Sequence, residues 1–164
     1  QTIVACGVLG IGVSREQDFT ALLRFYQHLL PGGLLLLEIY MLYADKKAWP
    51  LFQKDARGQL PEPWPDYVGQ PPQDDHEYEL HYRLLSVDPL EQRTVGEMRT
   101  LLFKDGQVAE DVTHRLTSNY YFAHESQMLL EKAGFTVEAR KGDWTDEDAT
   151  GEHNVIIFFA RKPS

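Results

Sequence analysis

The sequence predicts an α/β domain that carries a separate antiparallel β-sheet as an insertion. Residues 1–43 have the pattern strand, helix, strand, and residues 119–164 have the pattern helix, strand, strand. Between them, residues 77–118 alternate apolar and polar side chains, as strands with one covered face do. Residues 44–76 contain six prolines and form a fourth region, a loop or lid.

The first region is a β-α-β unit. Residues 2–8 are a short apolar run with β-branched members, which favours a buried strand. Ser14 to Gln17 is a capping box that opens a helix, and Pro31-Gly32-Gly33 ends it. Leu34 to Tyr40 is apolar almost without a break, and such a strand is typical of a parallel sheet that is covered on both faces.

The two middle regions differ in pattern. Trp49, Trp64 and Tyr67 stand among the prolines of residues 44–76 and favour a lid over a merely mobile loop. Residues 78–117 predict a three-stranded meander, whose second turn is the hairpin Lys104-Asp105-Gly106-Gln107. Arg99 and its neighbours make one face of the second strand partly polar, as the wall of a cavity would be.

The last region predicts a helix over residues 124–132 and strands over 135–139 and 155–160. We expect the two strands to form an antiparallel hairpin at the edge of the sheet. The acidic run between them, residues 143–152, is predicted to be a solvated loop.

Composition excludes several classes of protein. The net charge of -9 and the lack of any Lys/Arg run longer than two residues argue against a nucleic-acid partner. The longest apolar run is too short to cross a membrane. The single Cys6 excludes an intramolecular disulfide and a Cys-x-x-Cys zinc site. We therefore expect a cytoplasmic protein, and because no Met precedes the first strand we expect a longer gene product.

Three segments carry a resemblance to a known family, the class I S-adenosylmethionine-dependent methyltransferases. Residues 29–37 resemble the turn into the fifth strand of that family, residues 129–137 the helix that enters the sixth, and residues 155–163 the seventh. The meander is similar to the insertion of small-molecule methyltransferases, such as the amino-sugar N,N-dimethyltransferases and glycine N-methyltransferase. The resemblance implies the C-terminal half of a seven-stranded Rossmann-like sheet with an inserted meander.

The same resemblance implies S-adenosylmethionine as the cofactor of the full-length protein. The backbone of Cys6, Gly7 and Val8 would flank the methionine part of the cofactor. The family's Gly-rich loop, its ribose-binding acidic residue and its adenine loop have no counterpart in the 164 residues. We therefore expect this chain alone to be inactive and to bind the cofactor weakly.

The segment Gly7 to Gly12 leaves one alternative open, a fragment of an NAD(P)-dependent oxidoreductase. Its glycines follow the order G-x-x-G-x-G, whereas a dinucleotide loop has G-x-G-x-x-G. A second alternative is a non-catalytic binding or dimerisation module in which the meander presents a strand edge to a partner.

Methyl transfer to an amine or hydroxyl requires a base for the acceptor's proton. Glu38 is the best candidate, because a carboxylate that follows four leucines is partly removed from water. Tyr40 and Tyr43 are candidates to line the acceptor site or to contact the sulfonium through their ring faces.

The meander offers His81 and Arg99 as further candidates for binding a polar small-molecule acceptor, provided that they point inward. No third ligand stands at metal spacing near its histidines, so a metal site is not expected. A homodimer, rather than a membrane or a nucleic acid, is the macromolecular contact that we expect.

Overall fold

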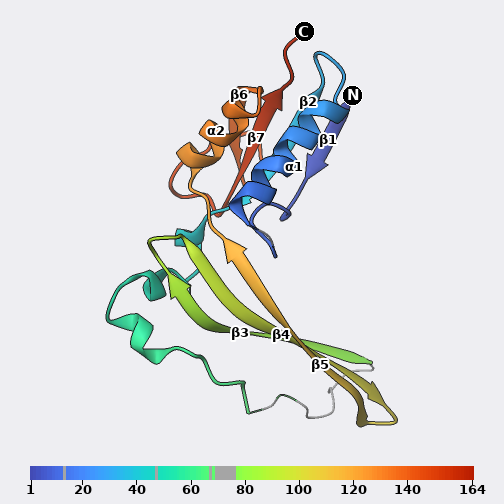
Figure 1. The fold of residues 1–164 in the computed structure, drawn as a ribbon, viewed down its shortest axis with the longest axis vertical. Helices are drawn as coiled ribbons and strands as arrows, with labels where there is room; N and C mark the ends of the chain where they lie inside the picture. Colours follow the sequence, from blue (N-terminus) through green and yellow to red (C-terminus); the bar gives the residue numbers. More distant parts are fainter. Residues whose placement is uncertain (13, 47, 67, 69–76) are drawn as a thin grey trace. The chain divides into compact units, whose positions relative to one another are not determined.

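The computed structural model describes residues 1–12, 14–46, 48–66, 68 and 77–164. The chain folds into two compact units (Figure 1). The first unit comprises Gln1–Pro50 together with Asn119–Ser164, and the second comprises Leu51–Ser118.

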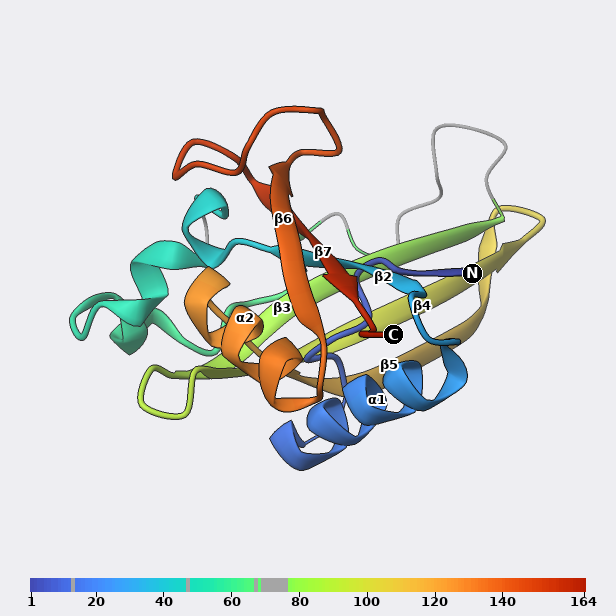
Figure 2. The same cartoon turned by 90° about the horizontal axis from the view of Figure 1, so that it is seen from above.

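The first unit contains a four-stranded sheet of order β1-β2-β7-β6. Figure 2 labels three of these strands, β2, β7 and β6. Its strands are β1 (Thr2–Ala5), β2 (Leu34–Tyr40), β6 (Thr136–Gly142) and β7 (Val155–Arg161). β1 is parallel to β2, and β7 is antiparallel to both of its neighbours. The final two strands therefore pair antiparallel as predicted, with β6 at the edge and β7 inside the sheet.

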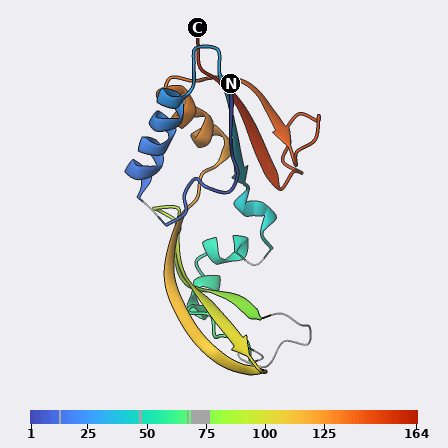
Figure 3. The same ribbon diagram turned by 90° about the vertical axis from the view of Figure 1, so that its right-hand side faces the viewer.

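Two helices lie on one side of this sheet, α1 (Arg15–His28) and α2 (Ala123–Lys132) (Figures 1 and 3). The predicted capping box opens α1: the Ser14 side chain accepts from the Gln17 amide, and the Gln17 side chain accepts from the Ser14 amide. This satisfies two backbone donors that the first turn of a helix leaves without intrahelical partners.

The two faces of the sheet are covered unequally. Leu35, Leu37 and Ile39 of β2 belong to the buried core that the sheet shares with both helices. On the opposite face, Val4 is 57% exposed and Leu36 is only half-buried. In the described residues the helices cover one face alone, so a sheet covered on both faces stays a prediction for the longer protein.

The second unit is built on the predicted meander, of order β3-β4-β5. Its strands are β3 (Tyr78–Asp88), β4 (Arg93–Lys104) and β5 (Gln107–Asn119), and they are long and strongly curved (Figures 1 and 3). β3 and β4 pair antiparallel. Asp105 and Gly106 have φ of 52° and 72°, which matches the predicted tight hairpin turn.

In the described residues between β2 and β3 there are three short 3₁₀ helices, Leu42–Ala44, Trp49–Phe52 and Ala56–Gln59, the last two within the proline-rich segment. Trp49 packs edge-on against Phe122 of the first unit, and Trp64 packs within the second unit. Tyr67, the third aromatic residue of the predicted lid, lies outside the described residues. Both tryptophans of this segment thus pack within their own units.

Candidate functional site

The candidate site lies at the carboxyl end of the parallel strands, where ligands of open α/β sheets bind. β1 ends at Ala5, which pairs with Leu37 of β2. The residues that follow this pair, Cys6 and Glu38, therefore lie at the same end of the sheet. Glu38 and Tyr40 point to the face of β2 that the helices leave open, because side chains alternate along a strand.

The backbone after β1 is accessible to a ligand. Cys6, Gly7 and Val8 are all exposed. Gly7 has a φ of 57°, in the left-handed region, and a Cβ at this position would meet no atom within 4 Å. A ligand can therefore approach this backbone closely, as the prediction for the cofactor's methionine part requires.

Glu38 is held by a residue that is far away in sequence. The indole Nε1 of Trp144 donates a hydrogen bond of 2.5 Å to Oε2 of Glu38, across 106 positions. Trp144 is itself 50% exposed. Glu38 as a whole residue is half-buried, whereas the bond to Trp144 is exposed, so its position combines access from solvent with a fixed donor.

The Trp144 side chain is presented by an unusual turn. The Thr145 amide donates to the Gly142 carbonyl at 2.9 Å, and the two residues between them, Asp143 and Trp144, have φ of 47° and 56°. Left-handed backbone at a bulky residue costs on the order of 1–3 kcal/mol. The Asp143 carboxylate stabilises the turn by accepting from the amides of Asn154 and Val155. The predicted solvated loop is therefore ordered by its own contacts.

Two tyrosines flank this end of the sheet in an acidic environment. Burial, followed by the charge of Asp45, raises the pKa of Tyr40. Burial, followed by the charge of Asp143, raises the pKa of Tyr43. Both phenols therefore stay protonated at neutral pH, so they can donate hydrogen bonds but cannot act as bases.

A buried carboxylate organises the loop between β1 and α1. Asp18 is 2% exposed and accepts from the Gly10 amide at 2.8 Å, the Asn119 side chain at 3.0 Å and the Tyr121 hydroxyl at 2.6 Å. Burial and the bond to Asp18 raise the pKa of Tyr121. These contacts tie the loop to the segment that follows β5.

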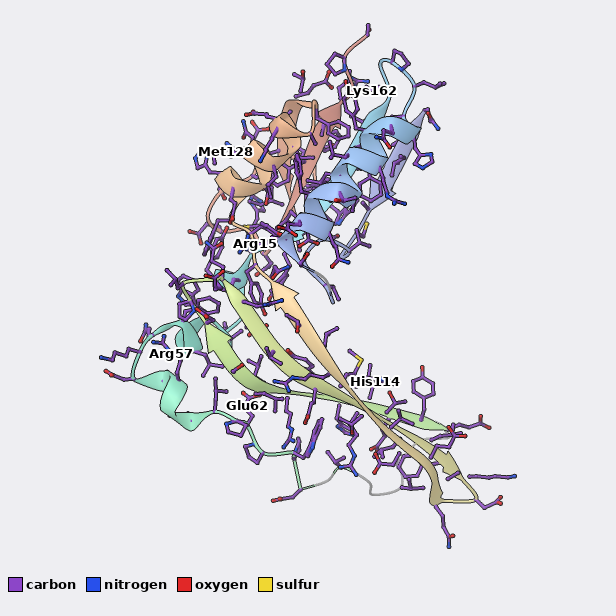
Figure 4. The ribbon with its side chains drawn as sticks, in the orientation of Figure 1. Arg15, Arg57, Glu62, His114, Met128 and Lys162 are labelled. Carbon is purple, nitrogen blue, oxygen red and sulfur yellow. The ribbon has the colours of Figure 1, made fainter. Side chains whose placement is uncertain are left out.

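Arg15 extends this network between the two helices (Figure 4). Its guanidinium forms an ion pair of 3.0 Å with Glu125 of α2 and lies 4.7 Å from the centre of the Tyr121 ring. The network joins the start of α1 to the start of α2.

The contacts that residues 7–12 make within the chain disfavour the binding of a dinucleotide. The Gly10 amide donates to Asp18, so a negative charge already lies where helix and loop amides would receive a pyrophosphate. A Cβ at Gly10 would overlap the carbonyl oxygen of Asn119, which explains the glycine by close backbone packing.

Comparison with known proteins gives a fold assignment. No family model and no curated protein matches the sequence. Among solved structures, a S-adenosylmethionine-dependent methyltransferase from Clostridium acetobutylicum matches 99% of the chain with a TM-score of 0.67 and 12% identity. The CcbJ methyltransferase from Streptomyces caelestis also matches 99% of the chain, with a TM-score of 0.64 and 15% identity. The chain has a methyltransferase fold.

The sugar N-methyltransferase KedS8 from a Streptoalloteichus species is also similar, with a TM-score of 0.50, 10% identity and 98% of the chain covered. The chain spans only 58%, 57% and 56% of these three structures. The likeness therefore concerns the fold of part of a methyltransferase, in agreement with the resemblance drawn from residues 29–37, 129–137 and 155–163.

In this methyltransferase fold, the predicted site residues fall into two groups. Cys6, Gly7, Val8, Glu38, Tyr40 and Tyr43 belong to the first unit, whereas His81 and Arg99 belong to the second and pair across β3 and β4. His81 contacts Glu79 at 2.8 Å, and Arg99 forms a two-pronged ion pair with Asp111 at 2.8 and 2.6 Å.

The partly polar face of the meander is thus a set of ion pairs, covered by an aromatic ring. Arg83 pairs with Glu97, and its guanidinium lies 4.5 Å from the centre of the Trp64 ring. Glu62, two positions before Trp64, accepts from the Leu84 amide and donates its own amide to the Leu84 carbonyl (Figure 4). The role of His81 and Arg99 in binding an acceptor stays a prediction.

Sequence reasoning missed Asp18 and Trp144. Asp18 stands four positions before Leu22, on the apolar face of α1. A charged residue on that face indicates a buried polar contact, and this signal in the sequence could have identified it. Trp144 follows Gly142-Asp143, a turn sequence within an acidic run, and nothing local connects it with Glu38.

Within the described ranges, no group of three or more His, Cys, Asp and Glu side chains could hold a metal ion. No helix in the described part of the chain has the length and apolarity to cross a membrane.

Proposed function

We propose that this chain supplies the acceptor side of a methyltransferase that transfers a methyl group from S-adenosylmethionine to a small molecule. The observation that carries the proposal is the group of Glu38, Tyr40 and Trp144 at the carboxyl end of parallel strands in a methyltransferase fold. The role of Glu38 is to accept the acceptor's proton, and the role of the aromatic rings is to line the acceptor.

The residues after β1 fit the cofactor. The exposed backbone of Cys6 to Val8 would lie against its methionine part, with the open space at Gly7 allowing close approach. When bound, the cofactor supplies an electrophilic methyl group on a sulfonium sulfur. The chain's contribution is to align the acceptor with that methyl group and to exclude water from it.

The charges around the site favour an amine as the acceptor. Glu38, Asp45, Asp143 and Glu152 place carboxylates near the rings of Tyr40 and Tyr43. Carboxylates and aromatic faces both attract an ammonium group. A base must remove one proton from that ammonium before its nitrogen can attack, and Glu38 is the carboxylate held at the strand end.

The open side of the sheet supports the proposal that the chain corresponds to the C-terminal half of a seven-stranded protein. β1 is an edge strand, and its residue Val4 is exposed on the face that lacks helices. Apolar side chains on a sheet face are normally covered by a second layer. Further strands next to β1 and helices over this face would cover them, and the matched structures are longer by such an amount.

The direct test is methyl transfer by the full-length protein. The protein is incubated with S-adenosylmethionine labelled in the methyl group and with D-glucosamine, glycine or D-glucose. We expect label in an amine product and none in D-glucose. Label in D-glucose but in neither amine would contradict the choice of an amine, and label in no product of a wider amine panel would contradict methyl transfer.

Calorimetry of the 164-residue chain with S-adenosylmethionine tests the partial nature of the site. We expect weak binding or none. A dissociation constant below about 10 μM, which corresponds to a binding free energy of about -7 kcal/mol, would contradict it.

One observation favours a second role, the formation of a homodimer through the meander. Its face opposite the ion pairs exposes the apolar side chains of Tyr78, Leu80, Tyr82, Leu102, Val108 and Val112. A contiguous apolar surface of this kind is typical of a protein–protein contact. We propose that a second copy of the chain covers it.

A further inference from the structure

We propose that Trp144 is a positioning residue for Glu38, and that the strained turn at Asp143 and Trp144 exists to direct the indole at that carboxylate. The inference rests on the proposed function, because it takes Glu38 as the base. No sequence pattern indicated Trp144, and the strained backbone at this turn is what orients its indole.

The two carboxylate oxygens of Glu38 have different roles in this geometry. The indole Nε1 of Trp144 donates to Oε2 at 2.5 Å. This bond fixes the rotation of the carboxylate, so Oε1 is the oxygen that is left to take the acceptor's proton. A tryptophan is suited to this task because its indole N–H can only donate and is carried on a rigid ring.

The strained turn at Asp143 and Trp144 is the second observation that supports this role of Trp144. Positions with left-handed φ favour Gly, Asn or Asp, and Asp143 meets that preference whereas Trp144 does not. The conformation persists because the Asp143 carboxylate accepts from the amides of Val155, the first residue of β7, and of Asn154, which precedes it. Strain that is held in place by its surroundings is characteristic of sites at which a side chain must be directed.

The Trp144 ring also shields the carboxylate. The bond to Glu38 is exposed and the ring is 50% exposed, so the indole takes the place of one water molecule at Oε2 and leaves the rest of the carboxylate open to solvent. A base with a fixed rotamer and partial shielding meets the acceptor in one geometry. Losing this restraint should lower the rate of the chemical step more than it weakens the binding of the acceptor.

A spectroscopic experiment tests the contact without any activity. The chain has three tryptophans and therefore gives three indole N–H signals in a proton–nitrogen NMR spectrum. Trp144→Phe identifies the signal of Trp144 by its loss. We expect Glu38→Gln to shift that signal and to leave the signals of Trp49 and Trp64 in place. An unmoved Trp144 signal would overturn the inference.

A double-mutant cycle in the full-length protein tests the function, with D-glucosamine as the acceptor probe. We expect Trp144→Phe, which keeps an aromatic ring but lacks the donor, to lower kcat about 10- to 100-fold with little change in KM. In a Glu38→Gln background the same change should cause no further loss, because Trp144 acts through Glu38.

The outcomes of this cycle distinguish a failure of the positioning role of Trp144 from a failure of the proposed function. Equal losses from Trp144→Phe in both backgrounds, or an unchanged kcat while Glu38→Gln is impaired, would overturn the positioning role and leave the proposed function standing. An unchanged kcat in Glu38→Gln would overturn the role of Glu38 as the base, and the inference with it.

Discussion

The indole nitrogen of Trp144 donates to the carboxylate of Glu38, and this bond joins the loop between β6 and β7 to the end of β2. The bond therefore holds the Glu38 side chain in place at the end of β2. The acidic residues of the same loop add to the negative environment around Tyr43. The loop consequently belongs to the candidate site.

The turn at Asp143 should depend on its carboxylate oxygen and not on its charge. Asp143→Ala removes the acceptor for two backbone amides and places a left-handed φ on alanine, so we expect a loss of about 2–3 kcal/mol in the free energy of unfolding. Asp143→Asn keeps an acceptor and tolerates the conformation, so its loss should stay below about 1 kcal/mol. Urea denaturation measures both, and equal losses would contradict this account.

Asp18 should be a main determinant of stability in the first unit. Asp18→Asn replaces a carboxylate that accepts three hydrogen bonds with an amide that directs a donor at other donors. We expect a loss of about 3 kcal/mol in the free energy of unfolding. Glu16→Gln, an exposed change in the same helical turn, is the matched control and should cost below about 1 kcal/mol. Similar urea midpoints for the two variants would be evidence against the network.

Tyr121 should make the stability fall in alkaline solution. The pKa of Tyr121 is raised in the folded state, so the unfolded state releases the phenol proton first. The stabilisation is therefore complete below the unfolded pKa of about 10 and decreases as the pH rises above it. We expect the advantage of the wild type over Tyr121→Phe to shrink between about pH 8 and about pH 11. A constant difference in urea midpoint across that range would refute the prediction.

The meander should control self-association. Leu80→Lys places a charge in the centre of the apolar face of β3, where Leu80 is 57% exposed, and should convert dimers to monomers. Leu90→Lys makes the same change at an 88% exposed position in the turn between β3 and β4, and should leave the dimer intact. Sedimentation equilibrium distinguishes the two, and a monomeric wild type would rule out the dimer.

Sequence patterns predicted the secondary structure well, because helix caps, turns and strands depend on residues that are close together in the sequence. Ser14 and Gln17 lie three positions apart and form the expected capping box. The turn at Asp105 and Gly106 depends on two adjacent residues, and it forms the predicted hairpin. Strand β2 occupies the predicted range because its residues are apolar apart from Glu38.

The parts that were missed depend on contacts between distant segments. Asp18 meets Asn119 and Tyr121 across more than 100 residues, and no local pattern encodes that meeting. The strain at Trp144 is set by Asp143, whose partners begin the next strand. The apolar run of β2 indicates that both faces of the strand are covered, but it does not identify the segment that covers the second face.

The most direct test of the central claim is kcat for methyl transfer to D-glucosamine by the full-length protein carrying Glu38→Gln. The matched control is Glu138→Gln, on the edge strand β6, which breaks an exposed ion pair with Arg161. We predict a loss of about 100-fold or more for Glu38→Gln and a wild-type rate for the control. A wild-type rate for Glu38→Gln would contradict the assignment of the acceptor's base to this strand end.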